Sequence, residues 1–380
     1  MIPYYPAVAD IDLDAAARNL RQVRSAIDGQ KILAVVKADA YGHGRAQCAR
    51  AFLAAGADFL GVAQLGEALA LREEIGPGPR ILAWIYAPGA PLVDAVRAGI
   101  DVSVGSFWAI DELAAAAKIT AIAARIHLKV DTAMTRGGFN LENVEEAARR
   151  IRGAGELFDP VGLWSHLARA DEPDCGVTEQ QIERFEQART AAARGGVVFE
   201  IHHLAASAGA LWHPATRYDM VRPGIVLYGL SPEPEVARAH DMGLRAVMTL
   251  SAQLTVDRQV PAGTGISYGH TAHTDRAMRL GVVPLGYGDG IDRKASNSAP
   301  LVVAGERTRI LGRVCMDQFV VPIPEHAQAG STVYLFGDAA AGLPTADDWA
   351  AATGTIGYEV VTRLGARVPR RYHGTGERCE

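Results

Sequence analysis

The residue with the most distinctive chemical setting is Lys37, within the segment AVVKADAYGHG at residues 34–44. It ends an otherwise apolar run, ILAVVK, that has the composition of a buried strand. An amine held in partly apolar surroundings has a lowered pKa, because burial disfavours its charged form. The neutral amine of a lysine can then attack a carbonyl carbon and form a Schiff base. The alternative is a solvated lysine that ends a strand, which is the commoner case for a lone lysine.

The residue pattern of the first 230 residues predicts the elements that position Lys37. Short β-branched runs, typical of strands, alternate with Ala-, Glu- and Arg-rich stretches whose apolar residues have helical spacing. Parallel strands need crossover connections, so eight such units predict a closed (β/α)8 barrel with Lys37 at its C-terminal mouth. An open doubly wound sheet is the alternative, but the Gly-rich dinucleotide fingerprint is missing after the first strand. Asp14 is expected to be the N-cap of the helix DAAARNLRQVRSAI. The expected strands are 32–37, 59–63, 81–86, 101–105, 124–130, 160–166, 197–203 and 224–229.

The texture changes after about residue 240, where strand-like runs follow one another without intervening helices and are punctuated by Gly and Pro. This pattern predicts a C-terminal all-β domain with one helical stretch near TADDWAAAT, residues 345–353. We therefore expect an α/β fold with a barrel domain at 1–240 and a β domain at 241–380. The first few residues are expected to pack with the β domain.

Composition excludes several classes of function. The chain has 380 residues, of which 49% are hydrophobic and 21% charged, with a net charge of −5 and no basic tract that would suit nucleic acid. It has no signal-peptide pattern and no apolar run of about 18 residues, so no membrane segment is expected. The four cysteines are widely spaced and form no metal motif, which suggests reduced thiols and a cytoplasmic location.

The segment around Lys37 resembles the lysine motif of the alanine racemases, and the resemblance continues along the whole chain in the order of that family. The family's fold, a barrel followed by a β domain, agrees with the division inferred above from texture. The resemblance implies a homodimer in which each active site is completed by the β domain of the other subunit. The segments that carry it are HLKVDTAMTRGGF (127–139), WSHLARADE (164–172), HHLAASAGAL (202–211), MVRPGIVLYGL (220–230), GISYGHT (265–271), PLGYGDG (284–290), GRVCMDQ (312–318) and TIGYEVV (355–361).

The resemblance implies a cofactor, pyridoxal 5′-phosphate, bound to Lys37, which is also one catalytic base. Tyr268 resembles the second base, which reaches the opposite face of the substrate from the partner chain, as a racemase requires. His166 resembles the hydrogen-bond partner of that tyrosine. Arg222 resembles the arginine that contacts the pyridine nitrogen of the cofactor, with His203 behind it. Because arginine only donates, the ring nitrogen is expected to stay unprotonated, which disfavours transamination.

The same comparison implies how the anionic groups are held. Ser207 and the backbone amides of Gly224 and Ile225 fit a phosphate site after the seventh and eighth strands, where barrels commonly bind phosphate. Tyr41 and Tyr358 match tyrosines of the family that contact the phosphate.

Three further positions concern the substrate. Arg136 matches an arginine that steers the substrate carboxylate and the cofactor phenolate, and Met316 matches a position whose backbone amide meets that carboxylate. Lys129 matches a lysine that many members carry as a carbamate, bracing the arginine equivalent to Arg136. No metal is expected.

The chain departs from the family pattern at two places near the pocket. It has TAMTRGGF where the family more often has Gly before the Met and a bulkier residue after the Arg, and HHLAAS where Asn often precedes the Ser. The substrate inferred is alanine, with D-alanine supplied to peptidoglycan, but a racemase of serine or of broad specificity is an alternative.

Other classes of protein fit less of the motif set. A barrel metallohydrolase could use His166, His203 and a carbamylated Lys129, but such sites generally need His-x-His on the first strand, where this chain has AVVK. A decarboxylase of basic amino acids shares the two-domain layout but places a carboxylate, not an arginine such as Arg222, at the ring nitrogen. A non-catalytic cofactor-binding barrel has no use for the β domain or for Tyr268.

Overall fold

The computed structural model describes residues 4–374. They divide into two compact units. The first, which we call the barrel unit, comprises Leu20–Ala40 and Cys48–Leu227. The second, which we call the β unit, comprises the other described residues.

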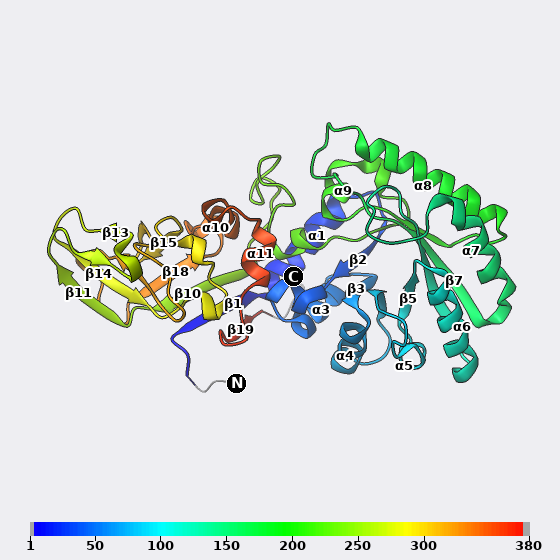
Figure 1. The fold of residues 1–380 in the computed structure, drawn as a ribbon, viewed down its shortest axis with the longest axis horizontal. Coiled ribbons are helices and arrows are strands. Elements are labelled where there is room, and N and C mark those ends of the chain that lie inside the picture. The colour runs from blue at the N-terminus through cyan, green and yellow to red at the C-terminus, as the bar shows by residue number, and fades with distance from the viewer. Residues whose placement is uncertain (1–3, 375–380) are drawn as a thin grey trace. The chain divides into compact units, whose positions relative to one another are not determined.

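The barrel unit contains eight parallel strands in the order β8-β7-β6-β5-β4-β3-β2-β9. Each strand from β3 to β8 pairs with its predecessor, β9 pairs with β2, and the sheet curls into a near-closed barrel (Figure 1). The gap between β8 and β9 is bridged by hydrogen bonds from Asp219 N to His202 O (3.1 Å) and from Arg222 N to Ala205 O (2.9 Å). The predicted (β/α)8 architecture is therefore confirmed. Its strands are β2 Lys31–Val35, β3 Phe59–Gln64, β4 Arg80–Ile85, β5 Asp101–Val104, β6 Ala124–Lys129, β7 Phe158–Trp164, β8 Ile201–His203 and β9 Met220–Val221.

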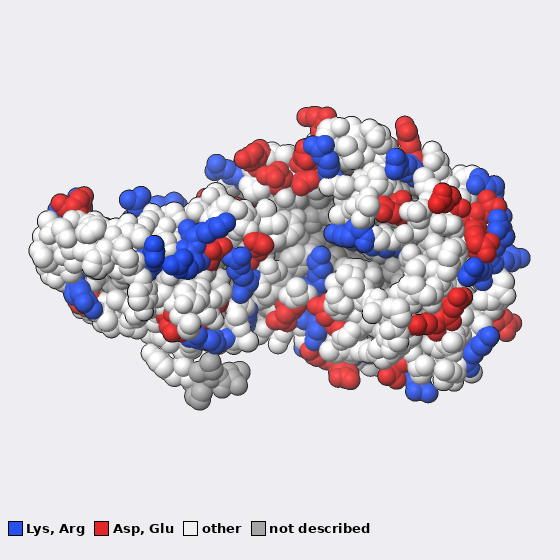
Figure 2. Space-filling view, viewed as in Figure 1, with Lys and Arg blue, Asp and Glu red and all other residues white. Residues whose placement is uncertain are grey.

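Helices connect these strands, and their positions follow the Ala-rich stretches of the sequence. Along α7 and α8, acidic and basic side chains lie next to one another on the surface, as Figure 2 shows, and form ion pairs such as Arg149 with Glu145 (2.8 Å). The helices up to residue 216 are α1 Leu13–Ala26, α2 Lys37–Gly42, α3 Arg45–Ala54, α4 Leu65–Ile75, α5 Leu92–Arg97, α6 Phe107–Thr120, α7 Leu141–Gly153, α8 Val177–Arg194 and α9 Ser207–Trp212, with short 3-10 helices η1 Gly155–Leu157 and η2 Pro214–Thr216.

Two expectations about local structure are wrong. The eighth strand lies at Met220–Val221, whereas the expected strand 224–229 contains a 3-10 helix, η3 Ile225–Tyr228. Pro223 has no N–H to continue the ladder, and an apolar run that is buried on every side has no periodicity to separate strand from helix. The cap of α1 is Asp12, whose carboxylate accepts the N–H of Ala15 at 2.9 Å, and not Asp14.

The β unit contains a six-stranded sheet in the order β16-β15-β18-β10-β1-β19, a three-stranded sheet β11-β14-β17 and the hairpin β12-β13. All pairs are antiparallel except β1 with β19, so strand β1 from the start of the chain lies between β10 and β19. The strands are β1 Ala7–Asp12, β10 Met248–Gln253, β11 Val256–Val260, β12 Gly265–Ile266, β13 Ala272–His273, β14 Met278–Val283, β15 Pro300–Val303, β16 Glu306–Arg309, β17 Phe319–Pro322, β18 Thr332–Phe336 and β19 Arg370–His373.

The helix predicted at 345–353 is present as α10, Ala346–Thr353. Its N-terminus is capped by Thr345, whose hydroxyl accepts the N–H of Asp348 at 3.0 Å. The other helices of the β unit are α11 Gly357–Thr362 and the 3-10 helices η4 Tyr268–His270, η5 Tyr287–Asp289, η6 Arg293–Ala295 and η7 Ala339–Ala341.

Candidate active site

The predicted site residues of the barrel unit lie at one end of the barrel, because each of them ends or follows a parallel strand. They come from five different strands, far apart in the sequence. Lys37 follows β2, Lys129 ends β6 and Arg136 follows it, His166 follows β7, Ser207 follows β8, and Arg222, Gly224 and Ile225 follow β9.

Lys37 opens α2, which is a left-handed turn: the φ angles of the next four residues, 38–41, lie between 51° and 54°. A left-handed turn of L-residues costs roughly 1–2 kcal/mol per residue, so the surrounding structure must enforce it. Glu67 contributes here, because its carboxylate accepts the N–H of Ala38 at 2.7 Å and that of Gln64 at 3.0 Å. It thereby ties the end of β2 to the end of β3. Glu67 carries little signal in the sequence beyond its place in the first turn of α4, and it was not among the predicted site residues.

The electrostatic environment of Lys37 is cationic. Burial, followed by the positive charge of Arg136, lowers the pKa of the Lys37 amine. Burial and then the charges of Arg136 and Arg222 lower the pKa of Lys129 to about 8. One region of the barrel mouth thus contains four basic side chains, Lys37, Lys129, Arg136 and Arg222. Such a region favours anionic ligands and keeps part of each amine neutral.

Arg222 is buried, with 4% of its surface exposed, and its hydrogen-bond partners are all uncharged acceptors. One guanidinium nitrogen donates to His203 Nδ1 at 3.1 Å. The other donates to the carbonyls of Ser165 (2.8 Å) and Leu204 (3.1 Å) and lies 3.2 Å from His166 Nδ1. Burial lowers the pKa of Arg222 to about 9, so the group remains protonated at neutral pH.

His166 is held as a neutral ring. Burial, then the charge of Arg222, moves its pKa well below the usual value. Because Arg222 only donates, the Nδ1 atom of His166 must accept, and its proton therefore lies on Nε2. His166 thus has an N–H to donate to a further group.

The two loops expected to bind phosphate, after β8 and β9, are hydrogen-bonded to each other, and the second of them is also bonded to β2. The N–H of Gly224 donates to the hydroxyl of Ser207 at 2.9 Å, and the carbonyl of Pro223 accepts the N–H of Val35 at 3.0 Å. Ser207 is buried and begins α9. A hydroxyl and backbone amides are neutral donors of the kind that bind a phosphate.

The loop that follows Lys129 is organised by Asp131. One of its carboxylate oxygens accepts the N–H groups of Ala133 (2.9 Å), Met134 (2.9 Å) and Thr135 (3.1 Å). Gly138, with a φ of 117°, then returns the chain against the backbone of β6. This tight loop presents Arg136 as an exposed side chain.

Two of the expected phosphate-contacting tyrosines lie together in the β unit. The ring centroids of Tyr41 and Tyr358 are 6.3 Å apart, and Tyr41 also packs on Tyr228 at 4.8 Å. Burial raises the pKa of Tyr41, so its hydroxyl stays protonated and can donate.

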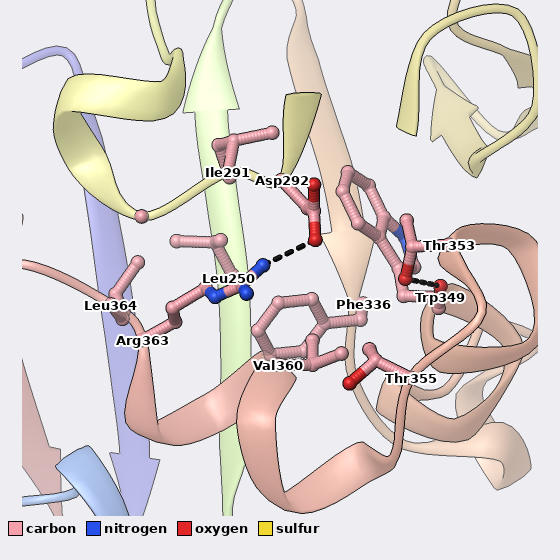
Figure 3. A pocket seen from close by; sticks show the side chains of 11 residues that line it. Leu250, Ile291, Asp292, Phe336, Trp349, Thr353, Thr355, Val360, Arg363 and Leu364 are labelled. Atoms are coloured by element: carbon pink, nitrogen blue, oxygen red, sulfur yellow. Dashed lines mark hydrogen bonds and ion pairs between the residues drawn. The ribbon is translucent and has the colours of Figure 1, made fainter. Parts of the chain in front are cut away.

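Tyr358 is carried by α11, and Val360 of the same helix lies beside Phe336 in the small pocket of Figure 3. An ion pair between Arg363 and Asp292 lies at the edge of this packing. The cavity that remains between these side chains has about 20 Å³, which is room for about one water and too little for an amino acid. The packing here therefore supports the helix and does not form a substrate site.

Tyr268 and Met316 lie on two loops of the β unit that are linked to each other. The hydroxyl of Ser267 donates to Arg313 O at 2.7 Å and lies 3.4 Å from Cys315 Sγ. The Tyr268 side chain is 71% exposed and that of Met316 is 53% exposed, which are high values for large apolar residues. The carbonyl of Met316 accepts the N–H of Gly288 at 2.8 Å, which fixes the orientation of this loop.

Residues 4–374 contain no group of three or more His, Cys, Asp or Glu side chains placed to hold a metal ion. Within the same residues, Cys48, Cys175 and Cys315 form no disulfide, and Cys379 lies outside them. None of the helices described is both long and apolar enough to cross a membrane.

Known proteins are similar to this chain along nearly its whole length. Residues 11–232 match the family model for the alanine racemase N-terminal domain, and residues 247–372 match that for the C-terminal domain. The alanine racemase of Beutenbergia cavernae is 51% identical over 375 residues, covering 97% of this chain and 98% of that protein.

Solved structures are similar as well. That of alanine racemase from D-cycloserine-producing Streptomyces lavendulae superposes with a TM-score of 0.95 at 44% identity, over 98% of both chains. The Bartonella henselae alanine racemase, solved with covalently bound pyridoxal phosphate, has a TM-score of 0.86 at 27% identity, over 97% of this chain and all of that one. With both family domains matched in order and relatives similar along nearly their full length, this chain belongs to the alanine racemase family.

Proposed function

We propose that this protein is a homodimeric, pyridoxal phosphate-dependent racemase that interconverts L- and D-alanine in the cytoplasm and supplies D-alanine for peptidoglycan. The observation that carries the proposal is the setting of Arg222: a buried, donor-only cation held among neutral acceptors at the barrel mouth that also contains Lys37. A decarboxylase would need a carboxylate in its place, and none of the described acidic residues forms an ion pair with Arg222.

The residues of the mouth fit pyridoxal phosphate. Its phosphate, phenolate and aldehyde call for cations, neutral donors and an amine with a lowered pKa, and the cluster around Lys37 offers all three. Lys37 would hold the aldehyde carbon. Ser207 and the amides of Gly224 and Ile225 would hold the phosphate together with Tyr41 and Tyr358. When bound, the cofactor withdraws electrons from the substrate and so acidifies its Cα–H bond.

Two bases on opposite faces of the substrate would complete the reaction. Lys37 serves one face, because burial and the nearby charge of Arg136 lower the pKa of its amine and favour the neutral form that accepts a proton. Tyr268 from a second copy of the chain serves the other face. The Nε2–H of His166 donates to the phenolate oxygen of that tyrosine and stabilises its charge. One base removes the Cα proton and the other returns a proton to the opposite face.

The substrate carboxylate would be bound by Arg136 and by the backbone amide of Met316. Burial, and then the charges of Arg136 and Arg222, lower the pKa of Lys129 to about 8, so a neutral fraction of the amine is available to react with carbon dioxide. A carbamate there would turn a repulsive neighbour of Arg136 into an attractive one.

The test combines chiral analysis with cofactor mapping. Purified protein is incubated with L-alanine, L-serine and L-lysine, and the D-enantiomers are measured. Borohydride is then used to fix the cofactor to the protein, and the modified peptide is identified. We expect D-alanine as the main product and an adduct on Lys37. Lys31→Ala, which alters an exposed lysine at the start of β2, the strand that precedes Lys37, is the matched control and should behave as the unsubstituted protein.

An adduct on another lysine, or loss of carbon dioxide without racemisation, would refute the proposal. Preferred turnover of serine would replace alanine as the substrate and leave the mechanism in place.

The shared site has its own test. Lys37→Ala and Tyr268→Ala homodimers should each be nearly inactive. Co-expression at equal levels should make about half of the dimers mixed, each with one intact site, and restore roughly a quarter of the activity. Verified mixed dimers that stay inactive would contradict a site built from two chains.

A further inference from the structure

A continuous chain of polar contacts runs through the apolar interior of the barrel unit and ends at Arg222. Arg222 contacts His203 Nδ1 at 3.1 Å, and His203 Nε2 lies 3.0 Å from His127 Nδ1. His127 Nε2 lies 3.3 Å from a carboxylate oxygen of Asp101. Asp101, His127 and His203 are all fully buried.

This chain connects the two ends of the barrel. Asp101 begins β5, at the N-terminal end of the strands, where its carboxylate is paired with the side chains of Arg80 and Arg125. His203 ends β8, and Arg222 follows β9 at the opposite, C-terminal end. The four residues therefore link a charged group at the base to the site at the mouth.

The sequence leaves room for the central contact. His127 on β6 and His203 on β8 are separated by β7, which carries Gly162 between them. A Cβ atom at Gly162 would lie 2.2 Å from His127 Nδ1, the atom that faces His203. Any side chain at position 162 would block the contact between the two histidines.

The ends of the chain determine the direction of every hydrogen bond in it. Arg222 only donates, so His203 Nδ1 accepts and its proton lies on Nε2. That N–H donates to His127 Nδ1, so the proton of His127 also lies on Nε2, facing the acceptor Asp101. Both rings are then neutral, and neither is an imidazolium.

The two ends of the chain differ in their charge. Arg222 is a buried cation that pairs with none of the described carboxylates, so its N–H groups need oriented neutral acceptors. Asp101 is already paired with Arg80 and Arg125, so it is linked to Arg222 through the hydrogen bonds of the two rings and is not its counter-ion. Burial alone would raise the pKa of Asp101, but hydrogen bonds from His127 and Arg80 and the charge of Arg80 lower it to about 2, so it stays ionised.

We propose that Asp101 and His127 are positioning residues of the active site, which set the tautomer of His203 and so hold Arg222 as an oriented, protonated donor at the barrel mouth. This inference rests on the proposed function for its catalytic consequence. If the proton of His127 lay on Nδ1, this N–H would face the Nε2–H of His203. His203 could relieve that clash only by moving its own proton to Nδ1, where it would face the guanidinium of Arg222. In serine proteases, a catalytic histidine held in the wrong tautomer lowers kcat by about 10⁴-fold.

The first test measures the tautomers directly in the purified holoenzyme. Long-range ¹H–¹⁵N spectra of protein labelled in its histidine rings report which nitrogen carries the proton, and the signals of His127 are assigned by their loss in His127→Gln. We expect neutral Nε2–H rings for His127 and His203. An Nδ1–H or a charged ring at either position would overturn the proposal, and this readout does not depend on activity.

The second test compares two replacements of one residue. In His127→Gln, the amide oxygen can accept from His203 and the amide nitrogen can donate to Asp101, so the direction of the chain is kept. His127→Leu removes both functions at a similar volume. We expect the leucine variant to lose roughly tenfold to a hundredfold in kcat, as is typical when an outer partner of a functional group is removed. KM should change little, and the glutamine variant should recover most of the loss.

Ser103→Ala is the matched control, because Ser103 is buried on the same strand as Asp101 and accepts the indole N–H of Trp164 at 2.9 Å without joining the chain. Its kcat should stay within about twofold of the unsubstituted protein. Equal losses in His127→Leu and His127→Gln, or an equal loss in Ser103→Ala, would show a purely structural role and overturn the proposal. If alanine is not racemised at all, the proposed function fails, while the tautomers still decide whether the chain exists.

Discussion

Ala133 is a residue whose backbone conformation suits glycine better. It lies in the loop that presents Arg136, at the position where the chain departs from the glycine more often found in the family. Its φ is 99°, a region that L-residues rarely adopt. We therefore predict that Ala133→Gly stabilises the protein.

The magnitude follows from two opposing terms. A non-glycine residue in such a region costs roughly 1–3 kcal/mol. Glycine loses roughly 0.5–1 kcal/mol because its unfolded chain has more freedom. Ala133 is exposed, so little buried surface is lost, and its N–H can still donate to Asp131. The net gain in the free energy of unfolding should be about 1 kcal/mol.

The assay is equilibrium unfolding in urea, in which the midpoint should rise for Ala133→Gly. The matched control is Ala115→Gly, an exposed alanine inside the right-handed helix α6. It should lower the free energy of unfolding by about 1 kcal/mol, the usual helix penalty for glycine. If both variants are destabilised by the same amount, the backbone strain at Ala133 does not exist and the reasoning is refuted.

Three further predictions follow from the barrel unit. The pKa of Asp101 in the folded protein, about 2, lies below its usual 3.8, so the roughly 2 kcal/mol that this carboxylate adds to the free energy of unfolding is present above pH 3.8 and is lost as the pH falls toward 2. The acid unfolding curve of Asp101→Asn should lack this pH dependence, and an unchanged curve would contradict the prediction. Gly138→Ala places a Cβ 2.8 Å from the backbone N of Asp131, so it should lower the free energy of unfolding by roughly 2–3 kcal/mol and raise KM for alanine. An unchanged KM would show that this loop does not contribute to substrate binding. Thorough chelation should leave activity intact, because residues 4–374 hold no metal-ligating cluster, and a loss restored by a divalent ion would reopen the hydrolase alternative.

Much of the fold was determined by local sequence. Alternating β-branched and Ala-rich stretches were enough to predict a parallel barrel, because only crossover helices can connect parallel strands. The loss of those helices after residue 240 predicted the β unit and its α10 helix. The eighth strand was misplaced because a run such as 225–228, buried on all sides, carries no periodicity.

The candidate site divides in the same way. Lys37 was a candidate from its place at the end of an apolar strand, where a solvated lysine is the commoner case, and a motif resemblance along the whole chain assigned its role and those of the other residues. That resemblance assigned each residue a role but not its state. The neutral ring of His166 and the lowered pKa of Lys37 arise from burial and from cations contributed by other strands.

Glu67, Asp101 and His127 were found only in the tertiary structure. Each is an ordinary residue in its own segment, and its importance depends on partners 26 to 76 positions away in the chain: Ala38 for Glu67, His127 for Asp101 and His203 for His127. Local sequence determines which elements form, because helix and strand preferences act over a few residues. Tautomers, charge states and the left-handed turn after Lys37 are decided by tertiary structure, because hydrogen bonds and burial act between segments that only the closed barrel brings together.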